Sequence, residues 1–175
     1  MFHFRFCPVC QSQLTDQVIA NEARLACSNP SCKFIHYDNP TPVVAAIVKM
    51  GNEVILANNK LWPPHFFGLI TGFLEKGESP EGGVVREVKE ELGIDCSINE
   101  LVGNYPFHRM NQVIMAYQVE APPAEIILGD ELAAYKSIPI DKLRPWPYAT
   151  GDAVADWLAR RGFNPDRIDL RSFRS

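Results

Sequence analysis

Short apolar runs recur along most of the chain, and their length is typical of strands rather than helices. The run VVAAIVKM at 43–50 is rich in β-branched residues and is followed by Gly51-Asn52 and then by EVILA at 53–57. Two such runs joined by a tight turn predict a β-hairpin. Further strands are expected at 68–74, 96–104, 112–119 and 132–138.

Two segments show helical periodicity instead. The first has a Ser79-Pro80 start and a Gly93 stop, and its apolar residues recur at spacings of three and four, at Val84, Val85, Val88 and Leu92. The second is expected to begin with Thr150 as its cap and to end at Gly162, with one apolar face formed by Val154, Trp157 and Leu158. A short helix is expected near Ile140, followed by a rigid turn in RPWPY, residues 144–148.

The mixture of strands and helices indicates an α/β or α+β sandwich. The 175 residues, 46% hydrophobic and 22% charged, suffice for one sizeable core plus a small satellite. Residues 1–40 are rich in cysteine and end in proline-rich, extended chain, whereas the strands and helices lie between 41 and 165. Residues 166–175 show no periodicity and are interpreted as a C-terminal tail.

Charge and apolar content exclude several classes of protein. The formal net charge of −4 argues against a chain whose main task is to coat nucleic acid. No apolar run approaches the ~20 residues that span a bilayer, and the N-terminal MFHFRFCPVC lacks the features of a signal peptide. We therefore expect a cytoplasmic protein without a membrane partner.

Four of the five cysteines lie in the first 32 residues, as a CxxC pair and a CxxxxC pair that 16 residues separate. Two pairs of thiolates are what tetrahedral Zn²⁺ requires, and this arrangement resembles a zinc ribbon. Four protein ligands leave no open position, so the zinc would be structural. The expected ligands are Cys7, Cys10, Cys27 and Cys32; bound iron or a disulfide are the alternatives. Cys96 is expected to be a small buried apolar residue.

The segment REVKEELG, residues 86–93, concentrates acid on one helix. Like charges at i and i+4 cost a helix a few tenths of a kcal/mol. Either Glu87, Glu90 and Glu91 form an ordinary solvated face, or they hold a hard divalent cation such as Mg²⁺ or Mn²⁺, which prefers oxygen ligands. Arg86 is expected to reach Glu90 at i+4.

A longer stretch around these residues decides between the two readings. GFLEKGESPEGGVVREVKEELGI, residues 72–94, resembles the Nudix box, GX5EX7REUXEEXGU, with every specified position filled. This resemblance implies a Nudix α/β/α sandwich with a mixed sheet over residues 41–165. It also implies divalent-metal-dependent hydrolysis of the pyrophosphate bond in a nucleoside diphosphate linked to another moiety.

The resemblance further implies roles for the residues at matching positions. The principal ligands of Mg²⁺ or Mn²⁺ would be Glu87 and Glu91, with Glu90 as a further ligand or as the base that orients water. Arg86 and Glu78 would be structural partners of the loop and of the ligands. The backbone carbonyl of Thr71 or Gly72 would complete the coordination of the metal.

A zinc ribbon before a Nudix domain resembles the NADH pyrophosphatases and a neighbouring group that acts on ADP-ribose or FAD. The first subfamily carries SQPWPFPxS after the box, but residues 104–117, NYPFHRMNQVIMAY, retain only Pro106-Phe107 of it. The resemblance therefore leaves NADH, ADP-ribose and FAD open. Glu131 falls where that subfamily has another metal-ligating glutamate; the alternative is an exposed residue at a strand edge.

Aromatic residues near the box are candidates for stacking on a base or a nicotinamide ring. The rings that could stack are Tyr105, Phe107, Trp62, Phe66 and Phe67. Of these, Tyr105, Phe107 and Phe67 are the expected substrate-binding residues; the alternative is that these rings belong to the core.

Three functions fit this sequence. The first is hydrolysis of a small nucleotide, by a chain that forms a homodimer as ribbon-bearing relatives tend to. The second is a non-catalytic nucleotide sensor whose ribbon binds nucleic acid or protein. The third, removal of an NAD cap from RNA, uses the same chemistry on a larger leaving group. The complete set of box carboxylates favours an enzyme.

Overall fold

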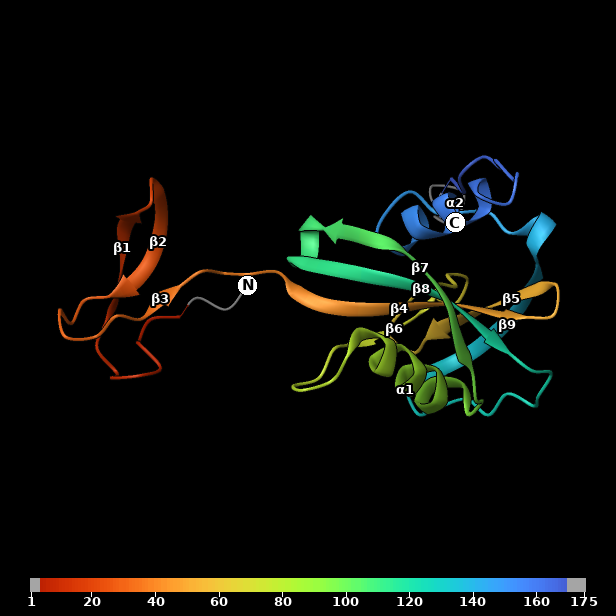
Figure 1. Ribbon diagram of the computed structural model, residues 1–175, viewed down its shortest axis with the longest axis horizontal. Helices are drawn as coiled ribbons and strands as arrows, with labels where there is room; N and C mark the ends of the chain where they lie inside the picture. The colour runs from red at the N-terminus through yellow and green to blue at the C-terminus, as the bar shows by residue number, and fades with distance from the viewer. Residues whose placement is uncertain (1–3, 170–175) are drawn as a thin grey trace. The chain divides into compact units, whose positions relative to one another are not determined.

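The computed structural model describes residues 4–169, so residues 170–175 of the expected tail lie outside the described part. The chain divides into two compact units, and the boundary along the sequence lies between Asn39 and Pro40 (Figure 1). Neither helix of the described residues is long and apolar enough to cross a membrane.

The N-terminal unit is a small antiparallel sheet. Its strands are β1 (Leu14–Ile19), β2 (Glu22–Cys27) and β3 (Ile35–His36), in the order β1-β2-β3. Its buried apolar side chains are limited to Cys7, Leu14, Ala26 and Cys27 among the described residues. So little apolar burial is insufficient to stabilise a unit of this size without a cross-link or a metal.

The second unit contains a mixed sheet of six strands, in the order β7-β8-β4-β5-β9 with β6 paired to β4. Only β4 and β8 run parallel among these pairs; the others are antiparallel. The expected hairpin is confirmed, and Gly51 adopts the left-handed φ of 61° that its tight turn needs. The strands are β4 (Thr41–Met50), β5 (Glu53–Asn59), β6 (Ile70–Phe73), β7 (Ser97–Phe107), β8 (Gln112–Ala121) and β9 (Leu132–Pro139).

Two helices, α1 (Pro80–Leu92) and α2 (Thr150–Ala159), cover opposite faces of this sheet (Figure 1). Successive residues of β4 alternate between the two cores. Val44, Ala46 and Val48 pack with the apolar face of α1, whereas Val43, Ala45 and Ile47 pack with that of α2. A strand buried on both faces reads as a continuous apolar run, as 43–50 does. The expected α/β/α sandwich with a mixed sheet is confirmed.

The ends of α1 follow the expected signals. The Ser79 hydroxyl accepts a hydrogen bond from the N–H of Gly82 (3.1 Å), and Pro80 is the first helical residue. Gly93 ends the helix in the left-handed conformation, with φ of 70°, and its N–H donates to the carbonyl of Lys89. The valines expected on one face divide: Val84 and Val88 are buried and Val85 is half-buried.

The expected cap of α2 is wrong. Thr150 is the first residue of the helix, and Ala149 occupies the cap position with φ of 51° and ψ of −120° and no side-chain capping bond. A residue with a Cβ rarely adopts this conformation. The helix also ends earlier than expected, at Ala159, and Gly162 takes a positive φ of 83° in the turn that follows.

Other boundaries differ by a few residues. The strand expected at 68–74 begins at Ile70, because Gly68 instead forms an isolated bridge to Ala57. The strand expected at 96–104 runs on to Phe107. The short helix near Ile140 is confirmed as a single 3₁₀ turn, Ile140–Lys142.

The start of α2 provides a test of the packing. A Cβ on Gly151 would lie 2.0 Å from the carbonyl oxygen of Trp146. Ala normally stabilises a helix relative to Gly by about 1 kcal/mol, but here we expect Gly151→Ala to lower the free energy of unfolding by about 1–3 kcal/mol, as overpacking does. Denaturant unfolding measures this change. Ala155→Gly, at a half-buried position of the same helix, gives the propensity effect alone, and stabilisation by Gly151→Ala would contradict the packing.

Candidate active site and zinc site

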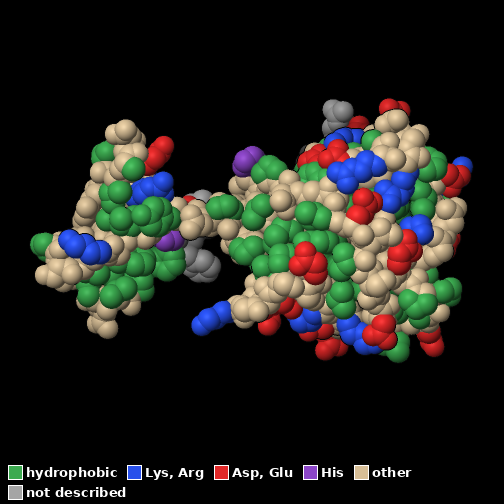
Figure 2. Space-filling model, in the orientation of Figure 1, with side chains coloured by type: hydrophobic (Ala, Val, Ile, Leu, Met, Phe, Trp, Pro, Cys, Tyr) green, Lys and Arg blue, Asp and Glu red, His purple; other side chains and the backbone are tan. Residues whose placement is uncertain are grey.

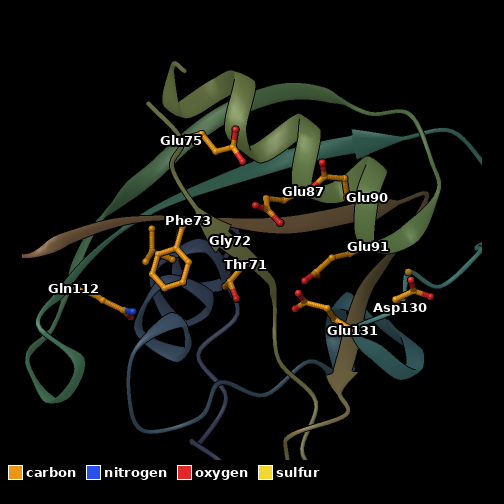
Figure 3. A pocket seen from close by; sticks show the side chains of 12 residues that line it. Thr71, Gly72, Phe73, Glu75, Glu87, Glu90, Glu91, Gln112, Asp130 and Glu131 are labelled. Atoms are coloured by element: carbon orange, nitrogen blue, oxygen red, sulfur yellow. The ribbon is translucent and has the colours of Figure 1, made fainter. Parts of the chain in front are cut away.

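Acidic side chains from three segments line one cavity of about 520 Å³, called here the acidic cavity (Figure 3). The segments are the loop after β6, one face of α1 and the loop that precedes β9, and the end of β6 adds Thr71 and Gly72 to the lining. The residues of this cavity that bear on its chemistry are Thr71, Gly72, Glu87, Glu90, Glu91, Asp130 and Glu131.

The first contact that shapes the cavity is between Gly72 and Glu87. Gly72 pairs with Val44 of β4, so β6 is fixed at this point by the sheet. A Cβ on Gly72 would lie 1.8 Å from the carboxyl carbon of Glu87. Only glycine therefore allows the Glu87 side chain to cross the strand and enter the cavity.

Arg86 ties the acidic residues together. Its Nε and Nη2 donate to the two carboxylate oxygens of Glu78 at 2.9 and 3.1 Å. Its Nη1 donates to Glu87 (2.7 Å) and to Glu90 (2.8 Å), which confirms the contact expected at i+4. A further bond goes from Nη2 to the carbonyl of Phe73 (3.1 Å). Because the guanidinium lies beside Glu78, it lowers the pKa of that carboxyl.

The loop before β9 brings Glu131 to the same cavity. The N–H groups of Ile127 and Gly129 donate to the carbonyls of Leu92 and Glu91 at 3.0 and 2.9 Å. These bonds satisfy carbonyls that the end of α1 would otherwise leave unpaired. A Cβ on Gly129 would lie 2.5 Å from a helix carbonyl, so the loop approaches α1 as closely as glycine permits. As a result, Glu131 and Glu91 point toward each other (Figure 3).

Burial and mutual repulsion make the carboxylates of this cavity hard to ionise together. Burial raises the pKa of Glu91 to about 8, and the charges of Glu87, Glu131 and Glu90 add to the rise. Burial also raises the pKa of Glu87, against the opposing effect of Arg86. A divalent cation would offset both effects. It would compensate the negative charge, and it would take the place of the water that burial removes from the carboxylates.

The donors are oxygen atoms, which suits Mg²⁺ or Mn²⁺ rather than a soft metal. Glu87, Glu91, Glu131 and Thr71 all line the cavity, so the expected metal ligands lie together. Their oxygens are not gathered as tightly as a closed ligand set: within residues 4–169, only the four cysteines bring three or more ligand atoms within 4.8 Å of one another. One oxygen of Glu87 is instead turned to Arg86.

A second and larger cavity of about 790 Å³, called here the aromatic cavity, adjoins the acidic one. Val43, Thr71 and Gln112 line both. The rings around the aromatic cavity come from the loop after β5, the end of β7 and the segment before α2: Trp62, Phe66, Phe107, Trp146 and Tyr148.

Of the three aromatic residues expected to bind substrate, only Phe107 lines this cavity. Tyr105 is a correction: it is 9% exposed, packs in the core with α2 and donates its hydroxyl to Asp156 (2.9 Å). Burial raises its pKa. Phe67 lies outside the set that lines the cavity: it packs against the same core, with the Nζ of Lys136 4.0 Å from its ring centre, and its role in binding substrate stays a prediction.

Sequence reasoning missed Trp146 and Tyr148 as cavity residues, because RPWPY predicts only a turn. The approach of this turn to the 59–67 loop is a tertiary contact, with the Phe66 and Trp146 ring centres 6.1 Å apart. Local pattern carries no signal of such a contact.

The N-terminal unit brings its four cysteines together. The Sγ atoms of Cys7, Cys10, Cys27 and Cys32 all lie within 4.8 Å of one another. The closest pair, Cys10 and Cys27, is 3.4 Å apart, far longer than the ~2.0 Å of a disulfide bond. Hydrogen bonding to Ser12 lowers the pKa of Cys10 to about 6, whereas burial raises the pKa of Cys27 to about 12. A bound metal ion would hold both as thiolates, because a coordinated thiol is deprotonated. This geometry fits a tetrahedral zinc site. Cys96 lies apart from it, half-buried against the core on the α1 side.

The cysteine cluster predicts the metal content of the protein. We expect about one zinc per chain by elemental analysis, as four thiolates require, and loss of that zinc in Cys27→Ser. Because the unit has little apolar core, the variant should lose the structure of residues 1–39 while the second unit keeps its thermal transition. Cys96→Ser is the control and should retain the zinc. Protein purified without chelator and found free of zinc would overturn the assignment.

The contact between Gly72 of β6 and Glu87 of α1 predicts how an added methyl group at position 72 changes metal binding. In Gly72→Ala the new Cβ displaces the Glu87 carboxylate from the cavity, so we expect the affinity for Mn²⁺, measured by calorimetry, to fall about 10- to 100-fold. Gly51→Asn, in a turn with nothing within 4 Å of the added Cβ, is the control and should bind as the parent does. Parental Mn²⁺ affinity in Gly72→Ala would contradict the role of this contact.

Two sequence relatives share most of this chain. The NAD-capped RNA hydrolase NudC of Pseudomonas aeruginosa strain LESB58 is 32% identical over 165 residues, which are 91% of this chain and 57% of that protein. The protein of the same name from Stutzerimonas stutzeri is 28% identical over 168 residues, 94% of this chain and 59% of that protein. The chain thus spans less than two thirds of the length of these curated relatives.

A solved structure and a family model agree with the fold. The crystal structure of a NUDIX hydrolase from Nitrosomonas europaea superposes with a TM-score of 0.77 at 24% identity, over 94% of this chain and 97% of that one. The model of the NUDIX domain matches residues 39–158, which include the box, the residues that line both cavities, α1 and all of α2 except Ala159. Because this match covers more than half of the chain, the protein belongs to the Nudix family.

Proposed function

We propose that this chain hydrolyses the pyrophosphate bond of a nucleoside diphosphate linked to another moiety, with Mg²⁺ or Mn²⁺ held in the acidic cavity. The observation that carries the proposal is the convergence of Glu87, Glu91 and Glu131 on one cavity. Relatives named as hydrolases of NAD-capped RNA support a substrate in which a diphosphate joins two moieties. Free dinucleotides such as NADH, ADP-ribose or FAD and an NAD cap on RNA share this bond.

The roles of the residues follow from where each one lies. Glu87 and Glu91 would hold the cation, with Glu131 and the carbonyl of Thr71 beside them. The bound cation would supply charge neutralisation at the phosphates and a nucleophilic water. Glu90, held at the rim by Arg86, would orient that water.

Arg86 has a positioning role in this scheme. Its bonds to Glu78 and to the Phe73 carbonyl anchor the guanidinium to the loop before α1. Its remaining bonds fix Glu87 and Glu90. Residues 1–40 would be the structural zinc ribbon and 41–165 the catalytic domain of a cytoplasmic homodimer, an assembly that light scattering of the purified protein would measure.

The alternative is a nucleotide sensor in which the ribbon binds a macromolecule. Apolar side chains gather on the visible face of the N-terminal unit (Figure 2). Phe4, Phe6 and Tyr37 are 51%, 64% and 52% exposed, and exposed apolar side chains that lie together can form a surface that binds another molecule. This surface favours a binding role for the ribbon but does not weigh against hydrolysis in the second unit.

A substrate panel distinguishes the two functions. NADH, NAD, ADP-ribose, FAD, diadenosine polyphosphates, nucleotide sugars and NAD-capped RNA are compared by kcat/KM with Mg²⁺ or Mn²⁺ present. We expect Glu87→Gln and Glu91→Gln to lose about 10²-fold or more in kcat, because the cation contributes several kcal/mol to the transition state.

The control is Glu125→Gln, which makes the same change of charge on an exposed residue outside both cavities. Equal turnover in Glu91→Gln and Glu125→Gln would refute the metal site. Binding of nucleotides without turnover of any member of the panel would favour the sensor.

A further inference from the structure

We infer that Lys60 and Asn59 are positioning residues for Glu131. Lys60 fixes the turn on which Glu131 stands, and Asn59 directs the carboxylate of Glu131. Asn59 ends β5 and Lys60 follows it, and both lie outside the set that lines the acidic cavity, so they act through Glu131. The inference rests on the proposed function, because it takes Glu131 as one of the carboxylates that hold the cation.

Glu131 stands on a turn and not on a regular strand. The N–H of Leu132 donates to the carbonyl of Gly129 (3.1 Å), which closes a four-residue turn with Glu131 at its third position. Glu131 itself is exposed. Exposed turns open locally at little cost, so a metal ligand on such a turn needs further bonds that keep it in place.

Lys60 supplies two of these bonds. Its backbone N–H donates to the carbonyl of Glu131 (2.9 Å), and its ammonium donates to the carbonyl of Asp130. With the bond that closes the turn, three consecutive carbonyls, those of residues 129–131, are satisfied. Every residue except proline could supply the backbone bond at position 60. The bond to Asp130 needs a long side chain that ends in a donor, and a charged donor makes the stronger bond.

The turn is thereby tied to two separate elements. Helix α1 holds its first residue, because the N–H of Gly129 donates to the carbonyl of Glu91 (2.9 Å). Lys60, at the end of β5, holds the next two residues. Glu131 therefore keeps its place relative to Glu91, which it faces across the acidic cavity (Figure 3).

A bulge in β9 brings Glu131 to Lys60. Asn58 pairs with Ala134 but Asn59 pairs with Leu132, so Ala133 has no partner on β5. In an unbroken ladder Leu132 would lie opposite Lys60, whereas the bulge brings Glu131 there instead. Bulges beside active sites often redirect a side chain in this way.

The side chain of Asn59 reaches the carboxylate itself. Its Oδ1 accepts the N–H of Leu61 (2.9 Å), so its Nδ2 is turned to Glu131, 3.5 Å from Oε2. Asn59, Glu91 and Glu131 also share the lining of a small cavity of about 40 Å³. Because the amide carries no charge, it can orient the carboxylate without taking the place of a cation.

Binding of Mn²⁺, measured by calorimetry on the whole chain, tests the role of Lys60. Lys60→Met keeps the length of the side chain and removes the donor. We expect the Mn²⁺ affinity to fall about tenfold, the lower end of the range for a residue that orients a metal ligand. Lys60→Arg keeps a charged donor and should recover most of the affinity. Lys142→Met is the matched control, because Lys142 is an exposed lysine outside all three cavities.

A double-mutant cycle separates positioning from a general loss of structure. In the Glu131→Gln background, neither Lys60→Met nor Asn59→Leu should lower the Mn²⁺ affinity further, because a residue that acts through another has no effect once that other is removed. Parental affinity in Lys60→Met, or an equal fall with and without Glu131, would overturn the inference.

Hydrogen exchange gives a readout that needs neither turnover nor added Mg²⁺ or Mn²⁺. The amides of residues 127–132 should exchange faster in Lys60→Met than in Lys142→Met, because the turn opens more often. Equal exchange rates in the two variants would refute the hold of Lys60 on the turn.

The inference and the proposed function can fail separately. If Glu91→Gln abolishes Mn²⁺ binding and turnover while Lys60→Met and Glu131→Gln bind Mn²⁺ as the parent does, the inference fails and the proposed function stands. If Lys60→Met weakens Mn²⁺ binding only where Glu131 is present, and no diphosphate is hydrolysed, the proposed function fails while the inference stands.

Discussion

The guanidinium of Arg86 counters the main electrostatic cost of this site, which is the placing of several carboxylates around one cavity. Its five donors form a planar fork, and the bonds to Glu78, Glu87 and Glu90 use that geometry in a way that a lysine ammonium could not. The same group reaches the carbonyl of Phe73, so charge compensation and loop anchoring depend on one side chain. A bound cation would supply the rest of the compensation.

The arrangement of the sheet and the two helices determines where the two cavities lie. The alternation of β4 between two cores places α1 and α2 on opposite faces of one strand, and the sheet fixes β6 beside it. The acidic cavity therefore opens on the α1 side and the aromatic cavity towards the start of α2. The strain at Ala149, a non-glycine residue with φ of 51°, falls at that second opening, where the surrounding packing must hold it.

The hairpin, the sandwich, the ends of α1 and the cysteine cluster could be predicted from the sequence, because each depends on the local spacing of residues. The resemblance to the NADH pyrophosphatases suggested Glu131 as a further partner of the box glutamates, and the hydrogen bonds of the loop before β9 to the end of α1 explain why Glu131 lies beside them. The errors of prediction concern contacts between segments. Tyr105 and Tyr148 look alike in sequence, yet one is buried under α2 and the other lines a cavity. The cap of α2 was misplaced because the conformation of Ala149 carries no compositional signal.

The two cavities differ in the kind of backbone that builds them. Helix α1 carries Glu87, Glu90 and Glu91, and Glu131 stands on the loop that is hydrogen-bonded to the end of this helix. The rings of Trp62 and Tyr148 stand instead on the connecting segments 60–69 and 143–149. Loops accept substitution and insertion far more readily than packed strands do. Selection could therefore alter the lining of the aromatic cavity by changing two short connections, while the carboxylates of α1 stayed as they were.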